Sequence, residues 1–233
     1  MKVLFIGNSH TFFNDMPHLF ARMAKETTGD EPETVMLAFG GRKLVWHRTE
    51  YFSLRYNLMY GGFDFCVFQQ GAHPYPPVED TMRDGAAIAD LCLRCGTKPV
   101  VFTTWAEKDN PEHQAIMTET CRRLAGETGS LLAPIGEVWE TVRNACPDVD
   151  LYHTDGKHAG VYGDFLCAAV LCRLLTGALS DGVSGMGSFF FPPDYRPGAE
   201  FRRLIEEPEK VEVSLDREKT DRILAAVRAA FSA

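Results

Sequence analysis

KVLFIGNSHT, residues 2–11, is a short apolar run that ends in a glycine and continues into a polar turn. A run this short, bounded by glycine, fits a buried strand better than a helix, so it predicts a first strand over residues 2–6. Gly7, Asn8 and Ser9 predict a turn directly after that strand. Asp15 and Pro17 then indicate the start of a helix, because both residue types are common at helix N-termini. The chain is therefore expected to begin with a strand, a turn and a helix.

The alternation of strand and helix recurs downstream. Apolar runs predict further strands at 34–39, 64–69, 98–104 and 130–134, and helical periodicity predicts helices at about 15–29, 44–60, 78–95, 112–128, 137–145 and 160–176. The runs at 64–69 and 98–104 are almost continuously apolar, which is typical of parallel strands covered on both faces. The pattern predicts a three-layer α/β/α sandwich with a five-stranded, mainly parallel sheet. Its site is expected at the carboxyl ends of the strands.

Composition narrows the class of protein. The chain has 233 residues, of which 45% are hydrophobic and 24% charged, and its formal net charge is −8. No apolar run is long enough to span a bilayer, and no basic cluster is present, so neither a membrane nor a nucleic acid is an expected partner. Seven cysteines, an odd number, favour reduced thiols over a disulfide framework. Because no secretory signal is visible either, a cytoplasmic location is expected.

The last quarter of the chain differs in composition. Residues 1–178 are expected to form the catalytic domain, and residues 179–233 an extension that packs on it and is not an independent domain. The extension ends in a predicted helix from Asp216. Before that helix, residues 188–193 read SFFFPP. Rings so close together are expected to be covered, either by the core, by the substrate pocket or by a second subunit in a homodimer.

Ser9 lies in the turn directly after the first predicted strand, where ligands of open α/β sheets bind. By itself, however, a Gly-Asn-Ser turn is more often a helix cap than an active site. The same holds for Asp155 and His158, which precede the last long helix of the core and alone are typical of a surface turn. In a catalytic role, Asp155 would orient His158, and His158 would take the proton of Ser9.

Together, the Gly-Asn-Ser turn and the Asp155-x-x-His158 pair resemble the first and fifth sequence blocks of the SGNH hydrolase superfamily, the GDSL-like esterases and lipases. The chain especially resembles a branch whose nucleophile block has Gly-Asn-Ser in place of Gly-Asp-Ser. The resemblance extends from residue 3 to about residue 176. It implies the flavodoxin-like fold of that superfamily, with Ser9 as the nucleophile and Asp155 and His158 as its partners.

The resemblance also implies an oxyanion hole. The backbone N–H groups of Ser9 and Gly41 would be two of its donors, and glycine permits close approach to a developing anion. The third donor in the family is an Asn side chain, but the third strand here runs into Gln69-Gln70-Gly71-Ala72-His73. An amide from Gln69 or Gln70 could make the same hydrogen bond, with His73 as the alternative donor.

Two residues are candidates for the substrate pocket. His73 follows the third strand, and Trp105 follows the fourth. Each also has a simpler interpretation, His73 as a surface loop residue and Trp105 as part of the core.

The function implied is that of a serine esterase acting on a small acyl ester, such as an acetyl group on a carbohydrate, with no cofactor. Two alternatives stay open. The first is a catalytically silent ligand-binding module on the same fold. The second is a metal-dependent hydrolase that uses His153, Asp155 and His158, although no second ligand cluster accompanies them. Cys92 and Cys95 resemble a redox pair, but their place at a helix end favours core cysteines.

Overall fold

Five parallel strands form the central sheet of the protein, which we describe from a computed structural model covering residues 1–185, 188–191 and 209–232. The strand order is β2-β1-β3-β4-β5, and every pairing is parallel. β1, the first strand of the chain, therefore lies inside the sheet, with β2 and β3 on its two sides. The strands are β1 (Lys2–Gly7), β2 (Glu33–Ala38), β3 (Phe65–Gln69), β4 (Lys98–Phe102) and β5 (Leu131–Ala133). The predicted sandwich and sheet are confirmed.

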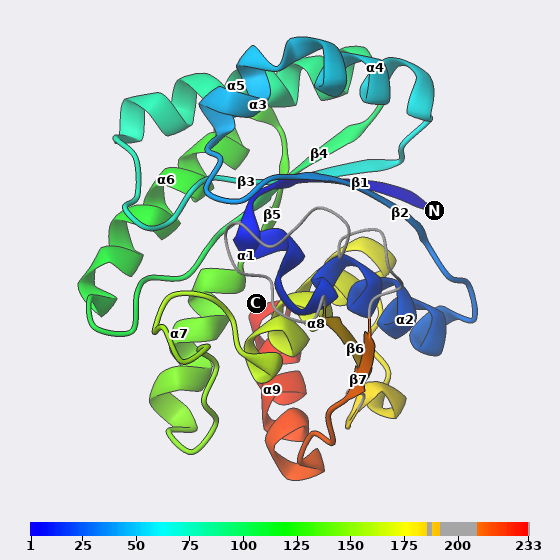
Figure 1. Cartoon of the computed structure of the whole chain (residues 1–233), viewed down its shortest axis with the longest axis vertical. Helices are drawn as coiled ribbons and strands as arrows, with labels where there is room; N and C mark the ends of the chain where they lie inside the picture. Colours follow the sequence, from blue (N-terminus) through cyan, green and yellow to red (C-terminus); the bar gives the residue numbers. More distant parts are fainter. Residues whose placement is uncertain (186–187, 192–208, 233) are drawn as a thin grey trace.

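Helices cover both faces of the sheet (Figure 1). One layer consists of α3 (Leu44–Thr49), α4 (Tyr51–Gly61), α5 (Val78–Arg94) and α6 (Gln114–Thr128), and the other of α2 (Met16–Thr28), α7 (Ile135–Ala145), α8 (Val161–Thr176) and α9 (Arg217–Ala230). Each layer closes a separate apolar core against one face of the sheet. This arrangement explains the apolar runs of β3 and β4, because strands inside such a sandwich are covered on both faces.

Two local differences from the prediction lie close to the site. The helix expected at 44–60 is two helices, because the backbone leaves the helical region at Glu50. The turn after β1 contains a short helix, α1 (Ser9–Phe12), and a 3-10 turn, η1 (Phe13–Asp15), before α2 begins. Periodicity misses such elements, since four residues are too few to show a repeat.

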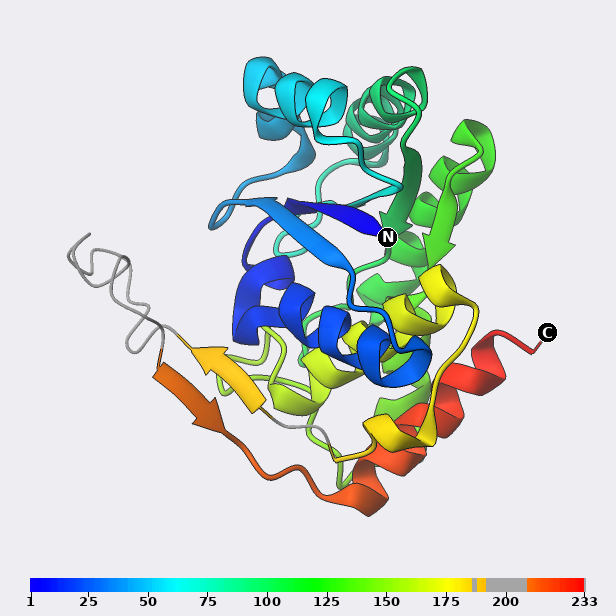
Figure 2. The same cartoon turned by 90° about the vertical axis from the view of Figure 1, so that its right-hand side faces the viewer.

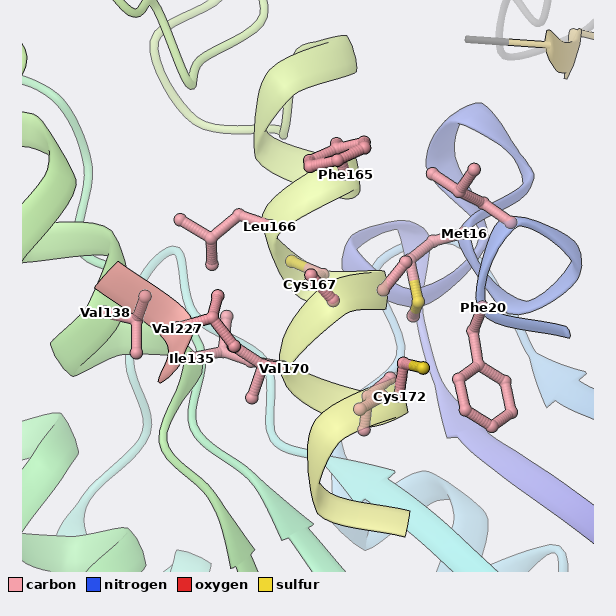
Figure 3. Packing of buried hydrophobic residues seen from close by; sticks show 14 of the residues in the cluster. Met16, Phe20, Ile135, Val138, Phe165, Leu166, Cys167, Val170, Cys172 and Val227 are labelled. Carbon is pink, nitrogen blue, oxygen red and sulfur yellow. The ribbon is translucent and has the colours of Figure 1, made fainter. Parts of the chain in front are cut away.

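α8 forms the centre of the larger core. Its residues from Gly163 to Cys172 are all buried, and they lie between the side chains of α2 on one side and those of α7 and α9 on the other (Figure 3). A helix that is apolar around its whole circumference must be enclosed, because exposing any face of it would leave apolar surface in water. The position of α8 is therefore determined by packing on all sides.

The C-terminal part of the chain contributes α9 and a short hairpin. Asp216 caps α9 by accepting hydrogen bonds from the backbone N–H groups of Glu218 and Lys219, and Ile223, Leu224 and Val227 join the core beneath α8. The hairpin pairs β6 (Ser188–Phe191) with β7 (Glu209–Glu212) in antiparallel register (Figure 2). The backbone of β6 lies beside η1. The three Phe rings of SFFFPP were predicted to be covered, but their side chains lie outside the described part of the structure, and so do the two prolines.

Two further observations concern cysteine chemistry and membranes. All seven cysteines are free thiols. Cys92 is buried, in agreement with its interpretation as a core residue, whereas Cys95 is only partly buried. Within the described part of the chain, no helix has the length and apolarity needed to cross a bilayer.

Asp164 is the one acidic residue in the buried stretch of α8. Its side chain is 0% exposed, and Oδ1 has no hydrogen-bond partner among the described residues. Burial raises the pKa of Asp164 well above its usual range, although a hydrogen bond from Asn14 opposes this shift. The folded protein therefore holds the carboxyl group in its neutral form at pH values where the unfolded chain ionises it.

We expect Asp164→Asn to increase stability more at pH 8 than at pH 5. An acid whose pKa is raised on folding makes the free energy of unfolding fall as the pH rises, by at most about 1.4 kcal/mol per pH unit, and Asn removes this titration. Thermal unfolding of both proteins at the two pH values measures the effect. The same difference in Tm at pH 5 and pH 8 would show that the carboxyl group ionises normally.

Candidate active site

The turn after β1 places Ser9 at the first position of α1, at the carboxyl end of the strand. Asn8 caps this helix, because its Oδ1 accepts a hydrogen bond of 3.0 Å from the backbone N–H of His10. Any larger residue in place of Gly7 would require the neighbouring side chains to move. A Cβ there would lie 2.2 Å from Oε1 of Gln69 and 2.3 Å from Oγ1 of Thr11. Close packing around Gly7 thus holds the serine turn against the end of β3.

The loop before α8 brings His158 and Asp155 to Ser9. Nε2 of His158 lies 2.8 Å from Oγ of Ser9, and Nδ1 of His158 lies 2.5 Å from Oδ2 of Asp155. The three side chains form one hydrogen-bonded chain across 149 residues of sequence between the serine and the histidine. This is the geometry in which an imidazole accepts a serine proton while a carboxylate holds its tautomer.

Asp155 is held in its ionised form. Its partial burial acts to raise the pKa, but hydrogen bonds from the His158 ring and from the backbone N–H groups of Lys157 and His158 outweigh burial and lower the pKa below its usual range. A carboxylate that accepts several hydrogen bonds stays charged at neutral pH. It can therefore stabilise the imidazolium that forms when His158 takes a proton.

Two aromatic rings enclose the imidazole of His158. The ring of Phe13 stacks on it with centroids 4.5 Å apart and an interplanar angle of 16°, and the ring of His10 lies 5.0 Å from it. His10 is buried, and burial, together with His73 and His158, lowers its pKa well below the usual range. A neutral ring beside His158 adds no repulsion to the imidazolium. His10 also contacts His73 and Trp105.

Gly41 lies in the turn between β2 and α3. Its φ of 69° is a left-handed conformation that favours glycine, and the Cβ position is open space. A hydrogen bond of 2.8 Å from Nδ2 of Asn8 to the backbone oxygen of Arg42 joins this turn to the serine turn. This hydrogen bond therefore joins the loops of Gly41 and Ser9, and the role of their N–H groups as oxyanion donors stays a prediction.

Gln69 and Gln70 direct their side-chain amides at neighbouring loops, whereas the sequence predicted that one of them would donate to the oxyanion. Oε1 of Gln69 accepts hydrogen bonds from the backbone N–H of Asn8 and the hydroxyl of Thr11, and Nε2 donates to the Gln70 oxygen. The Gln70 amide binds the backbone N–H groups of Leu44 and Gly71 and the hydroxyl of Thr81. Both side chains are buried, at 1% and 4% exposure. A buried amide must satisfy its polar atoms, and here the partners are the loops around the site.

Trp105 is a core residue and not a wall of the pocket. It is 0% exposed, and it stacks on Trp139 with ring centroids 4.1 Å apart. Its indole N–H donates a hydrogen bond of 2.8 Å to the backbone oxygen of Lys157, the residue before His158. Trp105 therefore holds the backbone of the loop that carries His158, since a buried indole N–H requires an acceptor.

His73 lines a cavity beside the site. The cavity has a volume of about 720 Å³, and it lies between the proline-rich segment at 73–78 and the side chains of Glu107, His113, Ile116 and Lys157. Burial lowers the pKa of His73 to about 4, although the nearby Glu107 carboxylate opposes this shift. His73 is therefore neutral at pH 7. Nζ of Lys157 lies 3.0 Å from the Glu107 carboxylate, so the cavity wall carries an ion pair.

His153, Asp155 and His158 do not form a ligand set. Nδ1 of His153 lies 3.7 Å from the Asp155 carboxylate, which is hydrogen-bonded to His158. Within residues 1–185, 188–191 and 209–232, no three His, Cys, Asp or Glu side chains are grouped so as to hold a metal ion.

Several residues at the site were not predicted from the sequence: His10, Phe13, Asn14 and Glu107. His10 is adjacent to Ser9, so its position was the available signal. The other three come close to His158 or His73 only through the tertiary fold. The sequence around them has no spacing typical of a catalytic motif.

Comparison with known proteins places the fold. The sequence matches no protein-family model and no curated protein. A solved structure from Slackia heliotrinireducens, described as a candidate SGNH hydrolase, is 27% identical, with a TM-score of 0.64 over 75% of this chain and 98% of that one.

Two other solved structures share the fold at lower identity. TesA is 15% identical, with a TM-score of 0.62 over 76% of this chain and 99% of its own. A variant of Axe2, an acetylxylan esterase from Geobacillus stearothermophilus, is 12% identical, with a TM-score of 0.62 over 75% of this chain and 93% of its own. The sheet order, the serine turn after β1 and the histidine loop before α8 agree with this similarity: the chain has the fold of the SGNH hydrolases.

Proposed function

We propose that the protein is a serine esterase that hydrolyses a small acyl ester, with Ser9 as nucleophile, His158 as general base and Asp155 as its orienting carboxylate. The observation that carries the proposal is the hydrogen-bonded chain of these three side chains, with distances of 2.8 Å and 2.5 Å. The position of the three residues supports the same conclusion, because all three lie at the carboxyl edge of a parallel sheet.

The reaction is an acyl transfer in two steps. Oγ of Ser9 attacks the ester carbonyl while Nε2 of His158 takes the hydroxyl proton, and His158 then gives that proton to the departing alcohol. Water attacks the acyl-serine in the second step, with His158 again accepting a proton and returning it to Ser9. Asp155 remains ionised throughout, since its hydrogen bonds hold its pKa low. The chemistry needs no cofactor.

Backbone N–H groups of Ser9 and Gly41 are the proposed donors to the oxyanion. The loops that carry them are joined by the hydrogen bond from Asn8 to Arg42. Gln69 and Gln70 serve this arrangement indirectly, because their amides hold the Ser9 turn and the start of α3 in place. Preorganised donors of this kind stabilise the charge that develops in the transition state.

The cavity beside His73 is the proposed site for the alcohol part of the ester. Its walls combine apolar side chains, such as Val78 and Ile116, with carboxylate, imidazole and ammonium groups. Apolar faces together with polar edges suit a hydroxylated ring, so an acetylated carbohydrate is the substrate class we favour. The fold similarity to an acetylxylan esterase supports this choice.

Ser9→Ala is expected to lower the rate of p-nitrophenyl acetate hydrolysis by at least about 10³-fold, because the acyl-enzyme can no longer form. The variant should also lose labelling by a fluorophosphonate probe, while its Tm changes little. Ser53→Ala, at an exposed position of α4, is the matched control and should behave as wild type. Residual hydrolysis within tenfold of wild type would contradict the assignment, and wild-type protein that is never labelled would indicate a silent binding module.

Ile116→Trp is expected to fill the cavity and to raise KM about tenfold or more for acetyl esters of bulky alcohols, such as acetylated xylosides. Hydrolysis of ethyl acetate should be unchanged, since its alcohol does not need the cavity. Ile116 is 47% exposed, so the larger ring can be accommodated without disturbing the core. Leu93→Trp, at a residue of α5 with 49% exposure that does not line the cavity, is the control. Equal KM values for Ile116→Trp and wild type would exclude this cavity as the alcohol site.

A further inference from the structure

The segment between α1, the short helix that begins at Ser9, and α2 has an unusual backbone. Asn14 and Asp15 both adopt left-handed conformations, with φ of 49° and 54°. Side-chain-bearing residues in this region cost about 1 kcal/mol or more each, and two in succession persist only where the surroundings impose them. The contacts of Asn14 identify what imposes them here.

Asn14 is buried, at 6% exposure, and its side-chain amide spans two distant parts of the chain. Nδ2 donates a hydrogen bond of 3.1 Å to the backbone oxygen of Ala159 and one of 2.5 Å to Oδ2 of Asp164. Ala159 directly follows His158, and Asp164 lies in the first turn of α8. One amide therefore ties the serine side of the site to both ends of the segment that joins His158 to α8.

The same turn determines the position of Phe13. Its ring stacks on the His158 imidazole at 4.5 Å and meets the ring of His153 edge-on at 5.5 Å. Because Phe13 and Asn14 are adjacent, the bonds made by the Asn14 amide hold the Phe13 ring against the catalytic imidazole. His158 is thereby restrained through its backbone by Asn14 and through its ring by Phe13.

Asp164 is the buried end of this connection. It accepts from Asn14 through Oδ2, while Oδ1 has no hydrogen-bond partner among the described residues. An unpaired carboxylate oxygen at 0% exposure would be costly if charged. The group therefore acts as a neutral acceptor, and a neutral amide of the same shape should replace it.

We propose that Asn14 is a positioning residue for catalysis: its hydrogen bonds to Ala159 and Asp164 set the distance and orientation of His158 relative to Ser9. This inference rests on the proposed function, since it assigns Asn14 a role in the Ser9–His158 proton transfer. The two hydrogen bonds of Asn14 account for its left-handed backbone beside α1, because they require its amide to face the histidine loop.

Asn14→Gly tests the proposal, because glycine adopts φ of about 50° without strain and removes only the amide. We expect kcat for p-nitrophenyl acetate to fall about 10- to 100-fold, as small misplacements of a catalytic group do, with KM changed less than threefold and the fold retained. Asp15→Gly is the matched control. It alters the adjacent left-handed position, whose carboxylate contacts His18, and it should keep kcat within threefold of wild type.

Asp164→Asn supplies the conservative variant, and it should also keep kcat within threefold because its amide oxygen can accept from Asn14. A readout that needs no activity is the downfield proton NMR signal of the Nδ1–H between His158 and Asp155. It should weaken or disappear in Asn14→Gly and persist in Asp15→Gly and Asp164→Asn. Such a selective loss would not follow from a purely structural role.

The proposal is overturned if Asn14→Gly keeps kcat within threefold of wild type, if Asp15→Gly loses as much activity, or if the NMR signal is the same in all variants. Failure of the proposed function has a different signature, namely a Ser9→Ala protein that still hydrolyses the ester. The two failures are therefore distinguishable in one set of assays.

Discussion

The enclosure of α8 is the constraint on which the rest of the structure depends. Its residues from Gly163 to Cys172 are buried between the sheet, α2, α7 and α9, so the helix has one position that covers its whole apolar circumference. The loop that carries Asp155 and His158 ends where α8 begins. Packing of an apolar helix thus brings a histidine across the core to a serine at the end of the first strand, and the hydrogen bonds at the site refine a position that burial has already set.

Polar groups in the interior act as connectors between loops. Gln69 binds the turn of Ser9, Gln70 binds the start of α3, and Trp105 binds the backbone of the histidine loop. Each is almost completely buried, so leaving its polar atoms without partners would be costly. When only the sequence is considered, Gln69 and Gln70 resemble donors to a substrate, and Trp105 resembles a wall of its pocket. In the folded protein their donors and acceptors are directed at the backbone of the site, which makes the site rigid before substrate arrives.

Burial and hydrogen bonds set the charge states of the titratable groups around His158. Burial lowers the pKa of His10 and His73 and raises that of Asp164, so burial favours the neutral form of all three groups. Asp155 is kept ionised by its hydrogen bonds, at the position where it can stabilise an imidazolium. A carboxylate hydrogen-bonded to Nδ1 of His158 is the electrostatic arrangement that general-base chemistry requires.

The sequence by itself determined the layered α/β architecture, the strand that precedes Ser9 and the pairing of Asp155 with His158. Each of these depends on local patterns: apolar runs, glycine-bounded turns and a short spacing before a helix. Only the tertiary structure decided that Gln69 and Gln70 face inward, that Trp105 lies in the core, and that Asn14 and Phe13 reach the histidine loop. These outcomes depend on contacts between residues far apart in the chain, such as the 145 positions between Asn14 and Ala159. A side chain's local sequence does not specify which distant backbone will satisfy its polar atoms, because that partner is chosen by packing.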